Sequence, residues 1–342
     1  MKFLLTFPDA TQQWPWEGAA YVETVRKSFE AAEDKRGHSL VTSAEDADVI
    51  LFLEPNSWKD RSYAEVLLKN PLIREHPEKC FAVGYSDSFL GFLPGLYTGV
   101  PKKFVDHSRY ETWCYLLGSP NPLVEKVSAL DRARDPRWLF SFRGTGTAPV
   151  REAIFQHAAH WPSDAIITRL QQGSFFSNSA QQQSEFVEEI LNSQFVLCPR
   201  GISPSSHRLY ETMACGRAPV ILADDWSPPP GPDWKSFAIF VKEAEVSRIP
   251  SILNAEKVSA SERGRLARRA WEEWFSPVHR VTRAFDLTAR MRAARHGVPD
   301  YERLWRSWRF YAPYGLAPHQ KLWRNLREGT LLQKAKAKLK RS

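Results

Sequence analysis

The sequence of 342 residues is long enough for two domains, and its 43% hydrophobic and 25% charged residues are ordinary for a globular protein, which excludes an intrinsically disordered chain. The N-terminal apolar run ends at Phe7, before Pro8, and is too short for a signal peptide or membrane anchor. The formal net charge is +8, and residues 260–342 carry 20 Lys and Arg against 7 Asp and Glu, so the excess belongs to the last quarter.

The first part of the chain is predicted to alternate short buried strands with helices. In chain order, we expect a strand at 2–7, a helix near 21–32, a strand at 49–53, a helix near 64–68 and a strand at 80–83. A cluster of charges at 131–136 then precedes the apolar run that begins at Trp138, which is typical of a linker between domains. We therefore expect domains at 1–135 and 136–275, followed by helices and a basic tail at 276–342.

The four cysteines, at positions 80, 114, 198 and 215, form no C-x-x-C pair and lie mostly in apolar surroundings. This pattern predicts reduced, buried thiols in a cytoplasmic protein, with neither a disulfide nor a structural zinc site.

Residues 195–226 have the pattern of a strand, a polar turn, a helix and a second strand. Phe195–Cys198 is apolar, and Pro199-Arg200-Gly201 has the composition of a turn. Ser205 or Ser206 can cap the following helix, which Gly216 is placed to end, before the next strand at 219–222. Two strands joined through a helix predict a parallel crossover, and such sheets bind ligands beyond the carboxyl ends of their strands.

The polar residues of this segment predict an anion site. Free N–H groups at the helix start, from about Ser205 to Arg208, favour a bound anion, and Arg200 and Arg208 present forks that match phosphate oxygens. A diphosphate would fit. Arg208 in the first turn opposes the helix macrodipole, so helix stability alone does not favour it. The alternative is an ordinary surface pair between Arg208 and Glu211.

The segment resembles the signature of the exostosin family, glycosyltransferase family 47, in which a Pro-Arg-Gly turn leads to a Ser-containing helix start, an Arg, an acidic residue and a Pro-Val-Ile strand. Three further stretches agree with the family: 138–144 together with Arg151, 93–97, and 224–226. The resemblance extends over residues 81–275, and its specific part is 139–226.

This resemblance implies an α/β architecture of GT-B type, with two Rossmann-like domains facing across a cleft, and an inverting transferase that uses a nucleotide sugar, generally a UDP-sugar. Arg200 and Arg208 would neutralise the diphosphate, Ser205 and Ser206 would hydrogen-bond it, and Glu211 would accept from the ribose hydroxyls. The donor-site residues expected on this basis are Arg143, Gly144, Arg200, Gly201, Ser205, Ser206, Arg208, Glu211 and Asp225.

Inverting transfer also needs a base on the acceptor side. Asp87, Asp106 and His107 lie near predicted loops of the N-terminal half, and Asp87 follows an apolar strand, although a turn residue or helix cap is an equally common role for such a carboxylate. Loops of this half would face a glycan or lipid-linked acceptor. Asp9 and the indole rings of Trp14 and Trp16 are acceptor candidates there, with simple packing as the alternative.

We expect no metal ligand set. Asp46-Ala47-Asp48 has the form of a manganese-binding D-x-D motif, but it precedes its strand, and we interpret it as the solvated start of that strand. Asp224 and Asp225 follow a strand and could contact a cation or the donor sugar. Two arginines make a metal unnecessary for charge neutralisation, so metal-independent transfer is expected.

The C-terminal region predicts helices at 262–275, 278–295 and 301–308, and it ends in a basic stretch at 334–341. A cationic amphipathic end favours contact with an anionic membrane surface, and a solvated tail is the alternative. Tryptophans at helical spacing indicate packing faces, so nucleic acid is not expected as a partner. Two further alternatives remain open, a non-catalytic nucleotide-sugar or glycan-binding relative and a basic adaptor.

Overall fold

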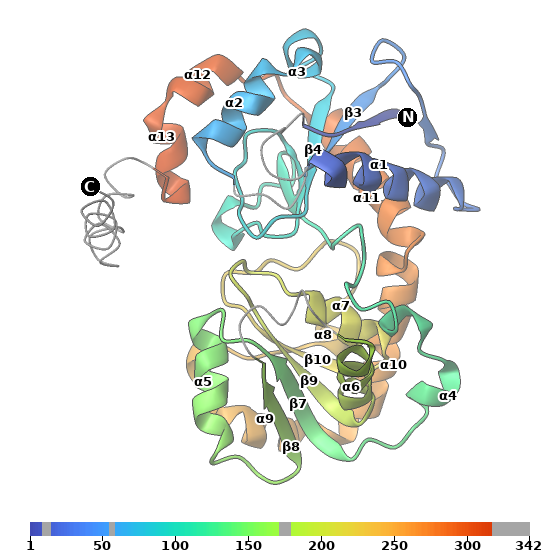
Figure 1. Ribbon diagram of the computed structural model, residues 1–342, viewed down its shortest axis with the longest axis vertical. Helices are drawn as coiled ribbons and strands as arrows, with labels where there is room; N and C mark the ends of the chain where they lie inside the picture. The colour runs from blue at the N-terminus through green and yellow to red at the C-terminus, as the bar shows by residue number, and fades with distance from the viewer. Residues whose placement is uncertain (9–14, 55–58, 171–178, 317–342) are drawn as a thin grey trace, which may run out of the picture.

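The computed structural model describes residues 1–8, 15–54, 59–170 and 179–316, with the side chains of 15–18 excepted. These residues form two α/β domains that lie one above the other along the long axis of the molecule (Figure 1). Each domain has its own parallel sheet with helices against its faces. The predicted α/β architecture of GT-B type is confirmed.

The N-terminal domain contains a six-stranded parallel sheet in the order β2-β1-β3-β4-β5-β6. The strands are β1 (Lys2–Thr6), β2 (Ser39–Leu40), β3 (Val49–Glu54), β4 (Cys80–Gly84), β5 (Gly95–Tyr97) and β6 (Tyr110–Thr112). The helices of this part are α1 (Pro15–Glu30), α2 (Arg61–Lys69) and α3 (Pro71–Glu75). β3 and β4 are buried along their whole length, as expected for central strands of a parallel sheet. The strands predicted at 2–7, 49–53 and 80–83 are confirmed.

The C-terminal domain contains a five-stranded parallel sheet in the order β11-β10-β9-β7-β8. Its strands are β7 (Trp138–Gly144), β8 (Ala165–Arg169), β9 (Ser193–Pro199), β10 (Ala218–Leu222) and β11 (Ile239–Phe240). Its helices are α5 (Pro149–Ala158), α6 (Ala180–Leu191), α7 (His207–Ala214), α8 (Trp234–Phe237), α9 (Ile249–Glu256) and α10 (Ala260–Ala270), and α4 (Ala129–Arg132) precedes β7. The predicted unit of strand, turn, helix and strand is β9-α7-β10.

The strand order shows where each sheet can bind a ligand. Counted within its own domain, each sheet begins with the order 2-1-3-4-5, which is the flavodoxin-like doubly wound arrangement. The order reverses between β1 and β3 in one domain and between β7 and β9 in the other. Open parallel sheets bind ligands at such a reversal, beyond the carboxyl ends of the strands. In the C-terminal domain this point lies beside the end of β9 and the start of α7.

The last helices return to the N-terminal domain (Figure 1). They are α11 (His279–Ala294), α12 (Tyr301–Arg306) and α13 (Trp308–Tyr311). On α11, the ring of Phe285 stacks on Phe3 at 4.4 Å and on Phe29 at 4.8 Å between centroids. Tyr301 and Tyr311 are buried in the apolar cluster on the other side of the same sheet. Residues 317–342, which include the predicted basic stretch 334–341, lie outside the described residues.

All four cysteines are free and buried, as predicted. Burial raises the pKa of each of these thiols to about 12, so they stay protonated and unreactive at neutral pH. Across the described part of the chain, helices are either too short or too polar to traverse a bilayer.

Candidate functional site

A cleft of about 590 Å³ opens between the two domains. From the N-terminal domain it is lined by loops that follow β4 and β5, and from the C-terminal domain by loops that follow β9 and β10. The segment after α13 contributes a third side, which includes Tyr314. The cleft therefore lies at the carboxyl ends of strands from both sheets, where the strand order predicts a ligand.

The Pro199-Arg200-Gly201 turn leaves β9 and is held from the neighbouring helix α5. Arg151 donates from Nε to the carbonyl oxygen of Arg200 at 2.8 Å and from its guanidinium to that of Pro199 at 3.2 Å. The Arg200 side chain lines the cleft, and its Nε donates to Glu243 at 2.7 Å. Gly201 lies against Arg151, since a Cβ added there would be 3.5 Å from that guanidinium. The turn is thus fixed by Arg151, while Arg200 is directed to the cleft.

Helix α7 begins where the sequence predicted, with Ser206 as its N-cap residue in an extended conformation. The prediction that a serine hydroxyl caps the helix is wrong, because the Ser206 side chain makes no capping hydrogen bond. Ser205 is also buried, and its hydroxyl lies beside Tyr115. Neither hydroxyl is used by the first turn of α7.

Arg208 occupies the first turn of α7 in an aromatic clamp. Its guanidinium lies 5.1 Å from the ring centroid of Phe142 and 4.9 Å from that of Phe186. Its Nε has no hydrogen-bond partner among the described residues, and burial lowers the pKa of Arg208. Burial and the nearby charge of Arg208 also lower the pKa of Arg151 to about 10. Two arginines therefore place positive charge beside the β9 turn, within reach of the charges of Glu211 and Asp87.

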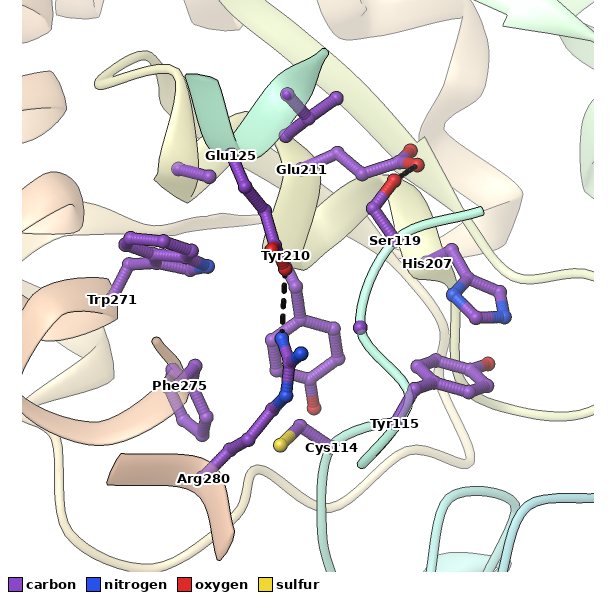
Figure 2. Close-up of a pocket in the computed structure, with 13 residues that line it drawn as sticks. Cys114, Tyr115, Ser119, Glu125, His207, Tyr210, Glu211, Trp271, Phe275 and Arg280 are labelled. Carbon is purple, nitrogen blue, oxygen red and sulfur yellow. Dashed lines mark hydrogen bonds and ion pairs between the residues drawn. The ribbon is translucent and has the colours of Figure 1, made fainter. Parts of the chain in front are cut away.

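Glu211 is a buried side chain, so the alternative of a surface pair with Arg208 is wrong. Its side chain is buried, at 5% exposure, and accepts a hydrogen bond from the Ser119 hydroxyl at 2.5 Å. Burial raises the pKa of Glu211. Figure 2 shows the Ser119 hydroxyl directed at the Glu211 carboxylate in a small cavity of about 20 Å³, where His207 stacks on Tyr115. Glu211 thus lies beside the wide cleft and is not part of its lining.

Arg143 and Gly144 end β7, next to β9, but the structure does not bring them to the described lining of the cleft. Arg143 donates from Nε to Glu189 at 2.9 Å and also pairs with Glu185 at 3.3 Å. Two carboxylates on α6 therefore balance the positive charge of Arg143, which we expected to face a donor phosphate. Arg143 is thus engaged in ion pairs, and its place in the donor pocket stays a prediction.

The acidic candidates that line the cleft are Asp87 and Asp225. Asp87 follows β4 and accepts a hydrogen bond from the Ser203 hydroxyl at 3.0 Å, across the boundary between the domains. The backbone oxygen of Asp225 accepts from the Lys102 N–H at 2.7 Å, which is a second link between the domains. The structure thus places both carboxylates at the rim where the domains meet.

Asp106 and His107 lie away from the described lining of the cleft. Asp106 accepts from the backbone N–H and the hydroxyl of Ser108, and the hydroxyl bond contributes most to lowering the pKa of Asp106. His107 is 79% exposed and pairs with Glu111. Both side chains are engaged in their own turn, so neither is placed to act as the base. Asp9 and Trp14, together with the side chain of Trp16, lie outside the described residues.

Lys59 is a cleft residue that the sequence did not reveal. It lines the cleft although its side chain is 2% exposed, and its Nζ lies 3.6 Å from the carboxylate of Glu54 at the end of β3. Burial lowers the pKa of Lys59, and the charge of Glu54 acts in the opposite direction. The signal in the sequence is Glu54 itself, a lone charge that ends an otherwise apolar strand.

Among the described residues, no group of three or more His, Cys, Asp or Glu side chains could hold a metal ion. Asp46 and Asp48 are exposed, and Asp48 accepts from the Lys2 backbone N–H at 2.8 Å. The D-x-D stretch is the solvated start of β3, as predicted.

Residues 116–255 match the Exostosin GT47 domain family model. The probable glucuronosyltransferase 47 A of Physcomitrium patens is 31% identical over 148 residues, which are 42% of this chain and 33% of that protein. The exostosin-1 homolog of Caenorhabditis elegans is 38% identical over 78 residues, which are 22% of this chain and 20% of that protein. The chain thus spans about a third or less of the length of these relatives.

Among solved structures, Anabaena Alr3699/HepE in complex with UDP aligns with a TM-score of 0.37 and 10% identity over 81% of this chain and 83% of that one. The resemblance predicted from the Pro-Arg-Gly turn and the helix that follows it is confirmed by the family match. Residues 116–255 of this chain are thus similar to the exostosin GT47 domain.

Proposed function

We propose that this protein is an inverting glycosyltransferase that moves a sugar from a UDP-sugar to a hydroxyl of a glycan or glycoconjugate. The observation that carries the proposal is Arg208. A partly buried cation between two rings, with its Nε unpartnered among the described residues, is stabilised when an anion binds to it. It lies at a helix N-terminus beyond the carboxyl end of a parallel strand, a position that favours a phosphate group.

The donor diphosphate is held between α7 and the β9 turn in this proposal. Arg208 and Arg200 neutralise its charge, and the hydroxyls of Ser205 and Ser206 donate to its oxygens, since α7 does not use them. Arg200 lines the cleft described above, and the other three residues lie at the start of α7 beside it. Glu211 accepts from the ribose hydroxyls. The hydrogen bond that Glu211 now receives from Ser119 is of the same kind, a hydroxyl donating to a buried carboxylate.

Transfer proceeds by a single displacement. Asp87 takes the proton of the acceptor hydroxyl while the hydroxyl oxygen bonds to the anomeric carbon from the face opposite the diphosphate. The bond from that carbon to the phosphate oxygen breaks, its electron pair stays on UDP, and the arginines stabilise the charge that develops. The Ser203 hydroxyl, 3.0 Å from Asp87, fixes the carboxylate from the donor side of the cleft.

Calorimetric titration with UDP tests the donor site, with GDP as the competing nucleotide and chelator present throughout. Arg208→Ala removes a charge-assisted phosphate contact and is expected to weaken UDP binding about ten- to a hundredfold. Arg265→Ala, which alters an exposed arginine of α10, should leave the affinity unchanged. Failure of the wild-type protein to bind UDP, or equal affinity for the two nucleotides, would overturn the assignment.

Turnover separates a transferase from a relative that only binds nucleotide sugars or glycans. We expect wild-type protein to release UDP from a UDP-sugar, with Asp87→Asn lowering kcat by about a hundredfold or more while the affinity for UDP is kept. Asp106→Asn serves as the matched control, because that carboxylate is bound within its own turn. Undiminished turnover by Asp87→Asn would show that Asp87 is not the catalytic base. Binding of UDP with no release from any UDP-sugar would favour the non-catalytic relative.

A further inference from the structure

We propose that the N-terminal wall of the cleft is a saccharide subsite, in which a pyranose ring of the acceptor packs on an aromatic platform made by Phe89, Phe104 and Tyr314. This inference rests on the proposed function, because it names the substrate class of the same cleft. All three side chains line the cleft, and they come from three separate segments of the chain. Phe89 follows β4, Phe104 follows β5, and Tyr314 follows α13.

The platform is a rigid arrangement of rings. Phe104 and Tyr314 are stacked, with centroids 4.9 Å apart and ring planes 15° from parallel. Phe89 meets Tyr314 edge-on at 5.7 Å and lies 5.6 Å from Phe104. Phe89 is also packed from behind by Tyr97 at 4.9 Å. The rings are therefore ordered before a ligand arrives, which reduces the entropy lost on binding.

Tyr314 and Phe104 provide the accessible part of the platform, because Phe89 is 9% exposed. Burial raises the pKa of Tyr314, and its hydroxyl meets the backbone of Gly91. Even so, Tyr314 and Phe104 are only partly buried, and both contribute surface to the cleft. One face of the Tyr314 ring is stacked on Phe104, so the ring surface left for a ligand is the part that lines the cleft.

The cleft combines aromatic rings with charged and polar side chains, and this combination indicates the class of ligand. Opposite the platform lie polar side chains of the C-terminal domain, among them Arg200, Ser203 and Asp225. A pyranose has an apolar C–H face and a rim of hydroxyls, so it can pack on rings while its hydroxyls reach carboxylates and hydroxyls. Asp87 lies in the same cleft, where it could take the proton of one of those hydroxyls. A flat aromatic surface with a few polar groups at its edge is typical of a small-ligand site.

Ligand-observed saturation-transfer NMR tests the subsite, with cellobiose, xylobiose and N,N′-diacetylchitobiose as probes and UDP present. We expect saturation of the ring C–H protons of at least one disaccharide by the wild-type protein. Tyr314→Leu and Phe104→Leu keep apolar volume but remove the flat ring, and each should weaken binding about five- to tenfold. Tyr314→Phe keeps the ring and should retain the wild-type affinity for the disaccharide. Trp308→Leu, at a 44% exposed ring that does not line the cleft, is the matched control.

Calorimetry with UDP on the same samples distinguishes failure of the subsite from failure of the proposed function. If the wild-type protein binds UDP but saturates none of the three disaccharides, the subsite is overturned and the donor site stands. The same conclusion holds if Tyr314→Leu and Phe104→Leu bind a disaccharide as the wild type does. If UDP does not bind, the proposed function itself fails. Retained UDP affinity in each Leu variant also shows that the protein remains folded.

Discussion

At the scale of single residues, the environment of His207 links stability to pH. The imidazole stacks on Tyr115 with centroids 3.4 Å apart, at the start of α7. Burial lowers the pKa of His207 to about 3. In the unfolded chain a histidine binds a proton near pH 6.5. Between these two values the unfolded state holds a proton that the native state does not, so the free energy of unfolding falls as the pH falls.

His207→Gln is therefore expected to flatten the loss of stability in mild acid. In the wild-type protein this one group lowers the free energy of unfolding by about 1.4 kcal/mol for each pH unit between about pH 6 and pH 4. Urea unfolding at pH 7, 5.5 and 4.5 measures the slope. His160→Gln, at an exposed site, should keep the wild-type slope. Equal slopes for His207→Gln and the wild type would show that His207 is not the source of this pH dependence.

Single residues also show how far a sequence predicts a site. The turn of Arg200 and the helix start of Arg208 could be placed because turn chemistry and apolar runs are local signals. The partners of Arg143 could not be predicted, because Glu185 and Glu189 reach it only through the pairing of β7 with the unit that contains α6 and β9. Charge compensation of this kind depends on the fold, and the sequence alone does not reveal it.

At the scale of elements, α7 is held in place at its end by α10. Arg268 of α10 donates to the carbonyl oxygen of Ala214, which satisfies one of the last carbonyls of α7 and places a cation at its C-terminus. Gly216 follows with φ of 69°, a left-handed conformation that favours glycine. Gly264 of α10 packs directly on this turn, since a Cβ there would overlap the Gly216 carbonyl oxygen. The close approach fixes how far α7 extends toward the cleft.

Gly264→Ala should therefore destabilise the protein, although glycine to alanine within a helix ordinarily stabilises by up to about 1 kcal/mol. Forcing a methyl group into a packed backbone contact costs about 1–3 kcal/mol, so the net expectation is a loss of up to about 2 kcal/mol. Chemical denaturation measures the change. Ser261→Ala, on an exposed position of the same helix, should be close to neutral. A stabilised Gly264→Ala variant would show that the two helices are not packed in this way.

At the scale of the whole molecule, α11 connects the domains and completes the N-terminal core. Trp113 donates from its indole to the backbone oxygen of Arg280 at 3.1 Å, and Arg280 in turn donates to the backbone oxygen of Leu116 at 2.9 Å. Phe285, further along α11, is fully buried between Phe3 and Phe29. The sequence predicted a helix at 278–295, but a helical pattern does not show which sheet the helix covers.

Phe285→Ala is expected to lower the free energy of unfolding by about 3–5 kcal/mol, because it leaves a cavity against two packed rings. Phe240→Ala, at a ring that is 49% exposed, should change it by less than about 1 kcal/mol. Thermal and urea unfolding of both variants provide the comparison. A loss at Phe285 no larger than that at Phe240 would mean that α11 does not close the N-terminal core.

The return of α11 to the first sheet also bears on how the protein is made. The N-terminal domain is built from two separate stretches, 1–116 and 279–316, whereas the strands and helices of the C-terminal domain are contiguous from β7 to α10. On the ribosome, the first sheet emerges with Phe3 and Phe29 lacking the ring that later covers them. Domains usually fold in the order of synthesis. Here the domain synthesised second is the first that can be completed, because the first keeps an apolar face uncovered until α11 has been translated.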